Sequence, residues 1–142
     1  MLVAEILRDK GNAVHAIAPQ LTVAEACVEL QRLRVGALMV CDGDDVVGIL
    51  SERDVVRAIA GQGPGALERP VADFMTSDVV FAAPGETVSI LMARMTERRI
   101  RHLPVRREGR LVGVISIGDV VARQIAESAR EAESLRTYIA AG

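Results

Sequence analysis

The chain contains a tandem internal repeat, and this feature constrains its fold more than any other. A shift of 65 residues aligns positions 14–56 with positions 79–121 without a gap, and 14 of the 43 aligned pairs are identical. Chance matching at ordinary residue frequencies would give roughly three identities. A shorter match, between residues 3–7 and 71–75, precedes the two copies. Because a unit of this size can hardly bury its sheet face alone, we expect the two copies to pack against each other.

Each copy opens with a predicted strand and a predicted helix. The apolar run at 14–18 ends at a proline, which a strand cannot continue past, and residues 79–83 repeat this pattern. Thr22 then precedes apolar residues at helical spacing, and Glu25 three positions later completes a capping box. In the second copy Thr87 stands at the same position.

Each copy closes with a predicted β-hairpin and a second helix. The predicted hairpin strands are residues 37–41 and 46–50 in the first copy and residues 102–105 and 111–115 in the second. Asp42–Asp45 between the first pair is typical of a hairpin turn. The second helix begins near residues 51–52, and its counterpart near 117–118. Each unit is therefore β-α-β-β-α, and we predict an α+β fold of two such repeats packed sheet to sheet about a pseudo-two-fold axis.

The repeat also predicts the domain boundaries. Residues 1–62 form the first repeat with a lead-in helix, 63–70 a linker, and 71–142 the second repeat with a C-terminal helix. The segment Gly61–Gly65 resembles a glycine-rich dinucleotide motif, but it follows a helix and contains a proline, so we interpret it as a flexible connection.

The C-terminal stretch at 119–141 predicts a long helix with interspersed charges, and two interpretations stay open. It is either a solvated extension of the second repeat or a contact with a partner or a second copy, through Val120, Ile125, Leu135 and Ile139.

Composition excludes several classes of function. The formal net charge is −2 and only 2% of residues are aromatic, so the chain offers neither a polyanion-binding surface nor base-stacking platforms for a nucleic acid. No apolar run approaches the ~20 residues of a membrane helix. The two cysteines, Cys27 and Cys41, fit a reducing compartment, which predicts a cytoplasmic protein. No residues show metal-ligand spacing or a nucleophile–base arrangement, so we expect neither a metal nor an enzyme.

Two equivalent segments, Gly48–Asp54 and Gly113–Asp119, carry the candidate chemistry. Each ends a strand, opens a helix and places a hydroxyl and a carboxylate three residues apart: Ser51 with Asp54, and Ser116 with Asp119. These residue types are typical of a helix N-cap with an acidic first turn. The same pair can also hold a sugar diol, while backbone N–H groups at the helix start favour a phosphate.

These segments resemble those of a tandem cystathionine-β-synthase (CBS) domain pair, or Bateman module. The resemblance covers nearly the whole chain and includes Arg-His-Leu-Pro-Val at 101–105 and the strand-Pro-x-x-Thr-Val opening of each copy. In that family the hydroxyl and the aspartate hold the ribose of an adenine nucleotide. The resemblance therefore implies two ribose-binding pairs, Ser51 with Asp54 and Ser116 with Asp119. Serine replaces the family's frequent threonine and keeps both donor and acceptor.

The surrounding basic residues suggest phosphate contacts. Arg53 stands at a helix start in the first copy. Its counterpart in the second copy is Gly118, which lacks the charge but opens access to the backbone. The second copy instead has a basic cluster, made of Arg99, Arg101 and His102. We expect at least one member of this cluster to contact a phosphate, and the Ser116–Asp119 half to be the better site.

The resemblance implies a stand-alone regulatory module that binds an adenine nucleotide in the cleft between the repeats. AMP is the first candidate, with ADP, ATP and NAD(H) as alternatives, and no catalytic cofactor is expected. Binding would favour one packing of the repeats and so signal to an unidentified regulated protein. The resemblance also implies a homodimer. The alternative is a protein-interaction scaffold with non-functional nucleotide sites.

Overall fold

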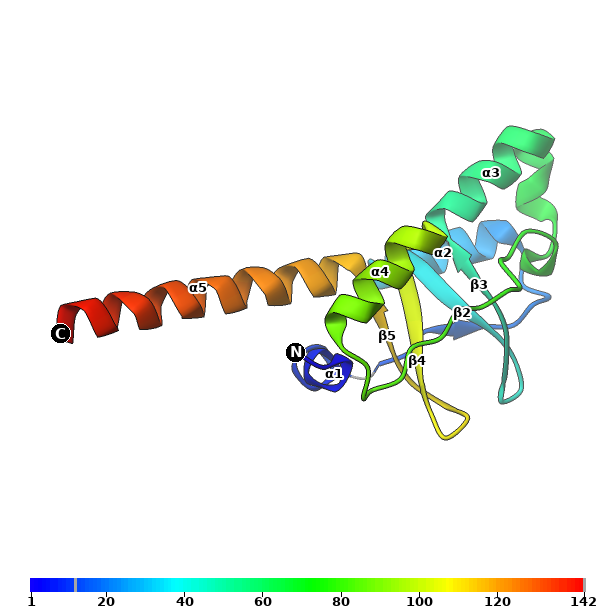
Figure 1. Cartoon of the computed structure of the whole chain (residues 1–142). Helices are drawn as coiled ribbons and strands as arrows, with labels where there is room; N and C mark the ends of the chain where they lie inside the picture. The colour runs from blue at the N-terminus through cyan, green and yellow to red at the C-terminus, as the bar shows by residue number, and fades with distance from the viewer. Residues whose placement is uncertain (12, 142) are drawn as a thin grey trace. The chain divides into compact units, whose positions relative to one another are not determined.

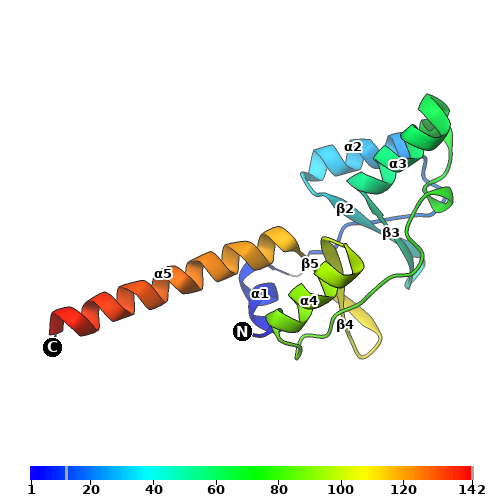
Figure 2. The ribbon, with the colours of Figure 1, turned by 45° about the horizontal axis from the view of Figure 1, so that its top comes forward.

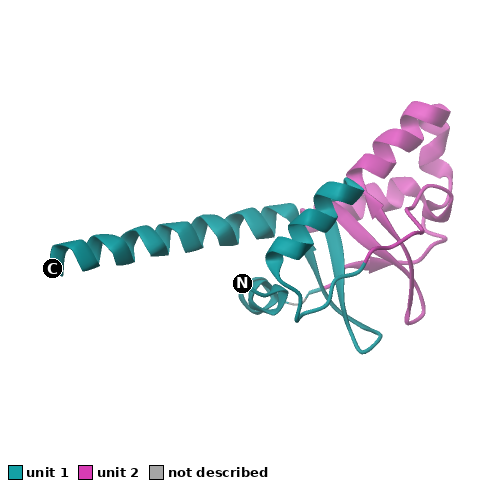
Figure 3. Ribbon diagram, in the orientation of Figure 1, with its two compact units in different colours: residues 1–13, 81–142 teal, residues 14–80 magenta. Residues whose placement is uncertain are grey.

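The structure is a computed structural model that describes residues 1–11 and 13–141 (Figure 1). It contains two compact units, coloured separately in Figure 3. Unit 2 is the continuous stretch 14–80, and unit 1 combines residues 1–13 with residues 81–142. Each unit contains helices and one small sheet, which confirms the predicted α+β class.

Unit 2 is built on a three-stranded sheet. The sheet order is β1-β2-β3, with β1 parallel to β2 and β2 antiparallel to β3. The elements in chain order are β1 (Ala16–Ile17), α2 (Val23–Leu33), β2 (Ala37–Asp42), β3 (Asp45–Ser51), α3 (Glu52–Gln62) and the 3₁₀ turns Gly63–Glu68 and Val71–Asp73. The predicted hairpin and both predicted helices of the first repeat are confirmed.

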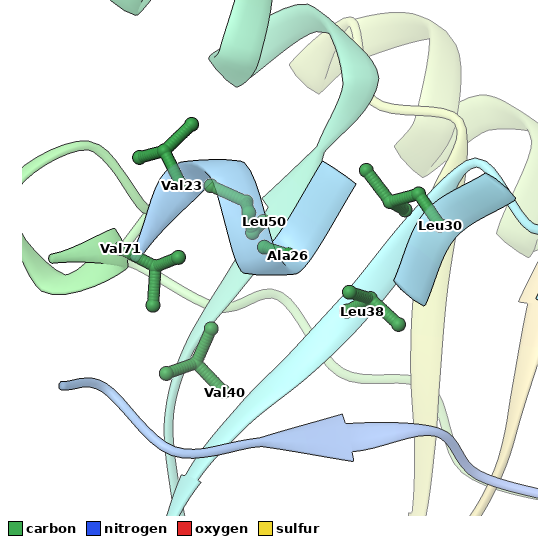
Figure 4. Packing of buried hydrophobic residues seen from close by; sticks show 7 residues of the cluster. All are labelled: Val23, Ala26, Leu30, Leu38, Val40, Leu50 and Val71. Atoms are coloured by element: carbon green, nitrogen blue, oxygen red, sulfur yellow. The ribbon is translucent and has the colours of Figure 1, made fainter. Parts of the chain in front are cut away.

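The core of unit 2 lies between α2 and its sheet (Figure 4). The seven side chains at its centre are all buried: Val23, Ala26, Leu30, Leu38, Val40, Leu50 and Val71. Three of them come from one face of α2, as the helical spacing predicts. The predicted capping box of this helix forms, since Thr22 Oγ1 accepts a hydrogen bond from the Glu25 amide at 3.1 Å.

Unit 1 repeats this plan with a smaller sheet. Its elements are α1 (Val3–Lys10), α4 (Val88–Arg98), β4 (His102–Arg107), β5 (Arg110–Ser116) and α5 (Ile117–Ala141). Strands β4 and β5 pair antiparallel. In both views of the ribbon, α5 continues well beyond α1 and α4 of its own unit (Figures 1 and 2).

The predicted strand at 79–83 is wrong, since it is reduced to one parallel bridge between Ala82 and Val105. In unit 2 the amide of Met39 extends the parallel pairing by donating to the carbonyl of His15 at 2.9 Å. Pro104 stands at the position of Met39 in the second repeat and has no N–H group. The proline therefore removes the hydrogen bond that lengthens β1 in the first repeat.

The predicted flexible linker is an ordered, packed connection. Gly63–Glu68 forms a 3₁₀ helix that contacts α2 and α3 and buries Ala66 completely. Pro64 suits the first turn of this helix because that turn needs no N–H donor there. The carbonyl of Arg69 then accepts a hydrogen bond from Val23 at the start of α2.

The lead-in segment of each repeat packs in the unit that holds the other repeat. Helix α1 lies in unit 1, where Leu7 contacts β5 at Gly113, and residues 71–75 lie in unit 2, where Met75 contacts β3 at Gly48. A Cβ atom at either glycine would lie 2.5 Å from the facing side chain. Both glycines thus face a lead-in side chain closely, and at Gly48 the carbonyl oxygen of Thr76 also lies within 3.1 Å of a Cβ position.

Candidate functional site

The two hydroxyl–carboxylate pairs lie where a strand turns into a helix in each unit. Ser51 Oγ accepts from the amide of Asp54 at 3.2 Å, and Asp54 Oδ2 accepts from the amide of Ser51 at 3.0 Å. Ser116 and Asp119 make the same reciprocal pair at 3.2 and 2.8 Å. Both pairs thus satisfy two backbone donors at a helix start, which confirms the N-cap interpretation. Each serine still has its own proton to donate, so the cap leaves hydrogen-bonding capacity for a ligand.

In unit 2 the carboxylate of Asp54 is held by a threonine. The side chain of Asp54 is only 6% exposed, and Thr76 Oγ1 donates to its two oxygens at 3.3 and 3.4 Å. The guanidinium of Arg57 lies 3.9 Å from Asp54 Oδ1 and is largely exposed. An open pocket of about 350 Å³ adjoins the carboxylate. Its lining residues are Asp54, Arg57, Ala58, Gly61, Gln62, Asp73, Phe74 and Thr76.

In unit 1 the equivalent carboxylate is held by a lysine. Lys10 Nζ donates to Asp119 Oδ2 at 2.6 Å and to the carbonyl of Val114 at 2.7 Å. Partial burial raises the pKa of Asp119, but the hydrogen bonds from Lys10 and from the Ser116 amide outweigh it and hold the pKa below the ordinary value of 3.8. Asp119 is therefore an ionised carboxylate whose charge is balanced by a cation from the N-terminal helix.

Two members of the predicted basic cluster lie beside Ser116. His102 is the register partner of Ser116 across β4 and β5, and the carbonyl of Arg101 accepts from the amide of Ile117 at 2.8 Å. Arg99 lies earlier, at the C-cap of α4, where its φ of 54° places it in the left-handed region. The structure thus brings Arg101 and His102 to the Ser116 junction and puts Arg99 at a neighbouring helix end.

The two junctions differ at the next position of the helix. Arg53 is exposed in the first turn of α3, whereas Gly118 holds the matching place in α5. A Cβ atom at Gly118 would meet only Ser116 Oγ, at 3.6 Å, so this side of the second junction is open. In unit 1 the basic residues beside the junction are Arg101, just before β4, and His102, the first residue of β4.

Lys10 and Thr76 contact the two carboxylates, and the sequence did not predict either. Both come from the segments that precede the repeats, but at different positions. The lead-in alignment pairs Lys10 with Asp78, and Thr76 with Arg8. A comparison of the two copies could not reveal them, because each carboxylate is contacted by a different residue type from a different lead-in position.

The described part of the chain, residues 1–11 and 13–141, contains neither a metal-ligand cluster nor a membrane-spanning helix. No three His, Cys, Asp or Glu side chains there are grouped as ligands for a metal ion. No helix in this part of the chain combines the length and apolarity needed to cross a membrane.

Comparison with known proteins identifies the family. The CBS domain profile matches residues 3–61 and 71–125. The CBS domain-containing protein CBSX3, mitochondrial, of Arabidopsis thaliana is 32% identical over 99% of this chain and 72% of its own length.

Two solved structures have the same fold. The crystal structure of the CBS-domain containing protein ATU1752 from Agrobacterium tumefaciens is 42% identical, with a TM-score of 0.86 over 87% of this chain and 99% of that one. The CBS domain protein PAE2072 from Pyrobaculum aerophilum, complexed with AMP, is 28% identical, with a TM-score of 0.74 over 84% and 89% of the two chains. The chain therefore belongs to the CBS domain family and contains two CBS repeats.

Proposed function

We propose that this protein is a regulatory module that binds an adenine nucleotide, AMP first, and does not transform it. The observation that carries the proposal is the hydroxyl–carboxylate pair that opens a helix in each unit. The AMP complex of PAE2072, a CBS relative, supports the choice of an adenosyl ligand. ADP, ATP and NAD(H) are the alternatives, since each contains the same ribose and adenine.

The chemistry of the junction suits a ribose. An ionised aspartate can accept hydrogen bonds from both hydroxyls of a ribose diol, and the serine hydroxyl can donate one. The start of a helix provides partial positive charge for a phosphate. Arg53 in unit 2, and Arg101, His102 and Arg99 in unit 1, are the proposed phosphate contacts.

We favour the Ser116–Asp119 junction as the better site. The side chain of Asp119 is 25% exposed, against 6% for Asp54, so it needs less rearrangement to meet a ligand. Lys10 adds a cation next to this carboxylate, and Arg101 and His102 lie at the same strand end. A nucleotide phosphate bound here would lie near Lys10, Arg101 and His102.

The regulatory output requires a conformational response and a recipient. In this proposal the protein works as a cytoplasmic homodimer, and ligand binding shifts it between two conformations that a regulated partner protein distinguishes. The shift is limited by the difference in ligand affinity between the two conformations.

Thermal unfolding against AMP, ADP, ATP, NAD⁺ and NADH tests the proposal directly. A ligand at about 100 times its Kd adds roughly 2.7 kcal/mol to the free energy of unfolding. We expect this stabilisation with AMP, a large loss in Asp119→Asn and a smaller loss in Asp54→Asn. Asparagine keeps an oxygen that accepts the backbone N–H, so the helix cap survives in both variants. Equal stabilisation in the wild type and in the double variant would overturn the assigned site.

The second candidate is a protein-interaction scaffold with non-functional nucleotide sites. It is favoured by one observation: both carboxylates already have intramolecular partners, Lys10 at Asp119 and Thr76 at Asp54. Absence of stabilisation by all five nucleotides would support this candidate against the sensor.

A further inference from the structure

Helix α5 leaves its second half uncovered. The helix runs for 25 residues, and every described residue from Ser128 through Ala141 is exposed. Figure 2 shows this part extending past the other helices of unit 1. Val120, which the sequence suggested as a contact residue, is fully buried in the core of its unit. A contact surface on α5 must therefore begin after Val120.

A seam of apolar and small residues follows the exposed face of α5. Its members are spaced alternately four and three residues apart: Val121, Ile125, Ser128, Ala132, Leu135 and Ile139. Ile125, Leu135 and Ile139 are 65%, 60% and 68% exposed. This spacing is that of the a and d positions of a coiled coil, in which the seam of one helix packs into that of another.

The charges on the same segment argue against a membrane surface as the occupant of the seam. The exposed half of α5 carries glutamates and arginines in mixture, at 130, 131, 133 and 136. An interfacial helix that binds anionic lipid has a predominantly basic polar face. A second helix of complementary charge fits this surface better.

We propose that the α5 helices of two copies of this chain form a parallel, in-register two-stranded coiled coil. With Ile125, Ala132 and Ile139 at a positions, Glu131 occupies a g position and Arg136 the following e position. In the parallel arrangement Glu131 faces Arg136 of the partner subunit, and the symmetry repeats this attraction. In an antiparallel pair centred on the seam, Glu131 would instead face Glu131 of the partner subunit, which is repulsive.

The contact that Arg136 makes within its own helix does not oppose this pairing with the partner subunit. Its guanidinium lies 3.7 Å from Glu133 Oε2 in the same helix, and both side chains are more than 70% exposed. Such a solvated pair contributes little, so Arg136 can turn to a new partner at small cost. Ser128 and Ala132 at the middle of the seam are small, which allows close approach of the two helices.

This inference rests on the homodimer in the proposed function and is independent of nucleotide binding. It assigns the surface, the direction and the register of the dimer. Cross-linking of the full-length protein separates the parallel from the antiparallel arrangement. In Ser128→Cys, a d-position thiol meets its own copy only in the parallel register. Arg130→Cys on the outward face is the matched control, and the wild type controls for Cys27 and Cys41.

We expect mild oxidation to convert most of Ser128→Cys to a covalent dimer and to leave Arg130→Cys and the wild type mainly uncoupled. Equal cross-linking of the two cysteine variants would overturn the parallel seam.

Light scattering on unoxidised protein provides the second test. Glu131→Arg should lower the dimer fraction, and adding Arg136→Glu should restore it, with helical content by circular dichroism unchanged. A dimer that is insensitive to Glu131→Arg and to Leu135→Lys would overturn the coiled coil while leaving a homodimer through another surface. A wild-type monomer would overturn both. Nucleotide-induced stabilisation, measured separately, decides the ligand site in either case.

Discussion

Lys10 Nζ lies 2.6 Å from Oδ2 of Asp119, a residue 109 positions away in the sequence. The same ammonium group donates to the carbonyl of Val114 in β5. A second ion pair, between Asp9 and Arg123, joins the same helix to α5. The segment before the first repeat therefore completes the unit that holds the second repeat, and it does so at the carboxylate proposed to bind ribose.

Removing the lysine should destabilise the protein modestly. The Lys10–Asp119 pair is partly exposed, and losing a charge-assisted hydrogen bond of this kind costs about 1 kcal/mol. For Lys10→Met we expect a fall in Tm of about 3 °C near pH 7. Lys10→Arg is the control, because it keeps the charge and should recover part of the loss. Identical Tm values for all three proteins would contradict a stabilising pair.

The same pair makes stability depend on pH in the acid range. The pKa of Asp119 is lowered in the folded protein, so its ionised form stabilises the fold above the ordinary pKa of 3.8. This contribution is lost as the pH falls from about 3.8 through the lowered pKa. We expect the stability difference between wild type and Asp119→Asn, measured by urea unfolding, to shrink over that interval. A difference that stays constant from pH 6 to below pH 3 would show that the Asp119 carboxylate contributes no pH-dependent stability.

At the other junction, Thr76 is expected to stabilise Asp54. Thr76→Val keeps the shape of the side chain but removes the donor to a buried carboxylate, which should cost about 1 kcal/mol. Thr76→Ser keeps the hydroxyl and should lie closer to the wild type in chemical denaturation. If valine proved as stable as serine at this position, the hydrogen bond from Thr76 would make no net contribution.

Local features of the fold could be predicted from the sequence because they depend on neighbouring residues. The Thr22 cap, the two hairpins and the Ser51 and Ser116 junctions all rest on side chains within a few positions of each other. The repeat and its motifs also predicted the CBS family.

The errors and omissions have non-local causes. The strand at 79–83 shortens because Pro104, on another strand, lacks a donor. The supposed linker is ordered because Ala66 finds a buried place beside α2 and α3. Lys10 reaches Asp119 because the lead-in segment of the first repeat packs in the unit that holds the second repeat. No spacing pattern in the sequence predicts this arrangement.

Because a different lead-in segment packs on each strand, Gly48 and Gly113 differ in what a larger side chain would meet, although they occupy equivalent positions in the repeats. At Gly48 a Cβ atom would lie 2.5 and 2.8 Å from Met75 Sδ and Cγ and 3.1 Å from the carbonyl oxygen of Thr76. At Gly113 it would lie 2.5 Å from one terminal methyl of Leu7, with the next contacts at 3.5 Å and beyond. A terminal methyl can rotate away, whereas a backbone carbonyl in a strand bridge cannot.

Gly48→Ala should therefore destabilise the protein by about 1–3 kcal/mol, as overpacking does, and Gly113→Ala by less. Urea unfolding of the two variants measures the order directly. Combining Gly48→Ala with Met75→Ala separates the two contacts, because it removes the side-chain clash and leaves the carbonyl of Thr76 in place. If the double variant is more stable than Gly48→Ala alone, the Met75 contact carries most of the cost. The reverse ranking of the two single alanine variants would mean that Leu7 is held more rigidly against β5 than Met75 and Thr76 are against β3.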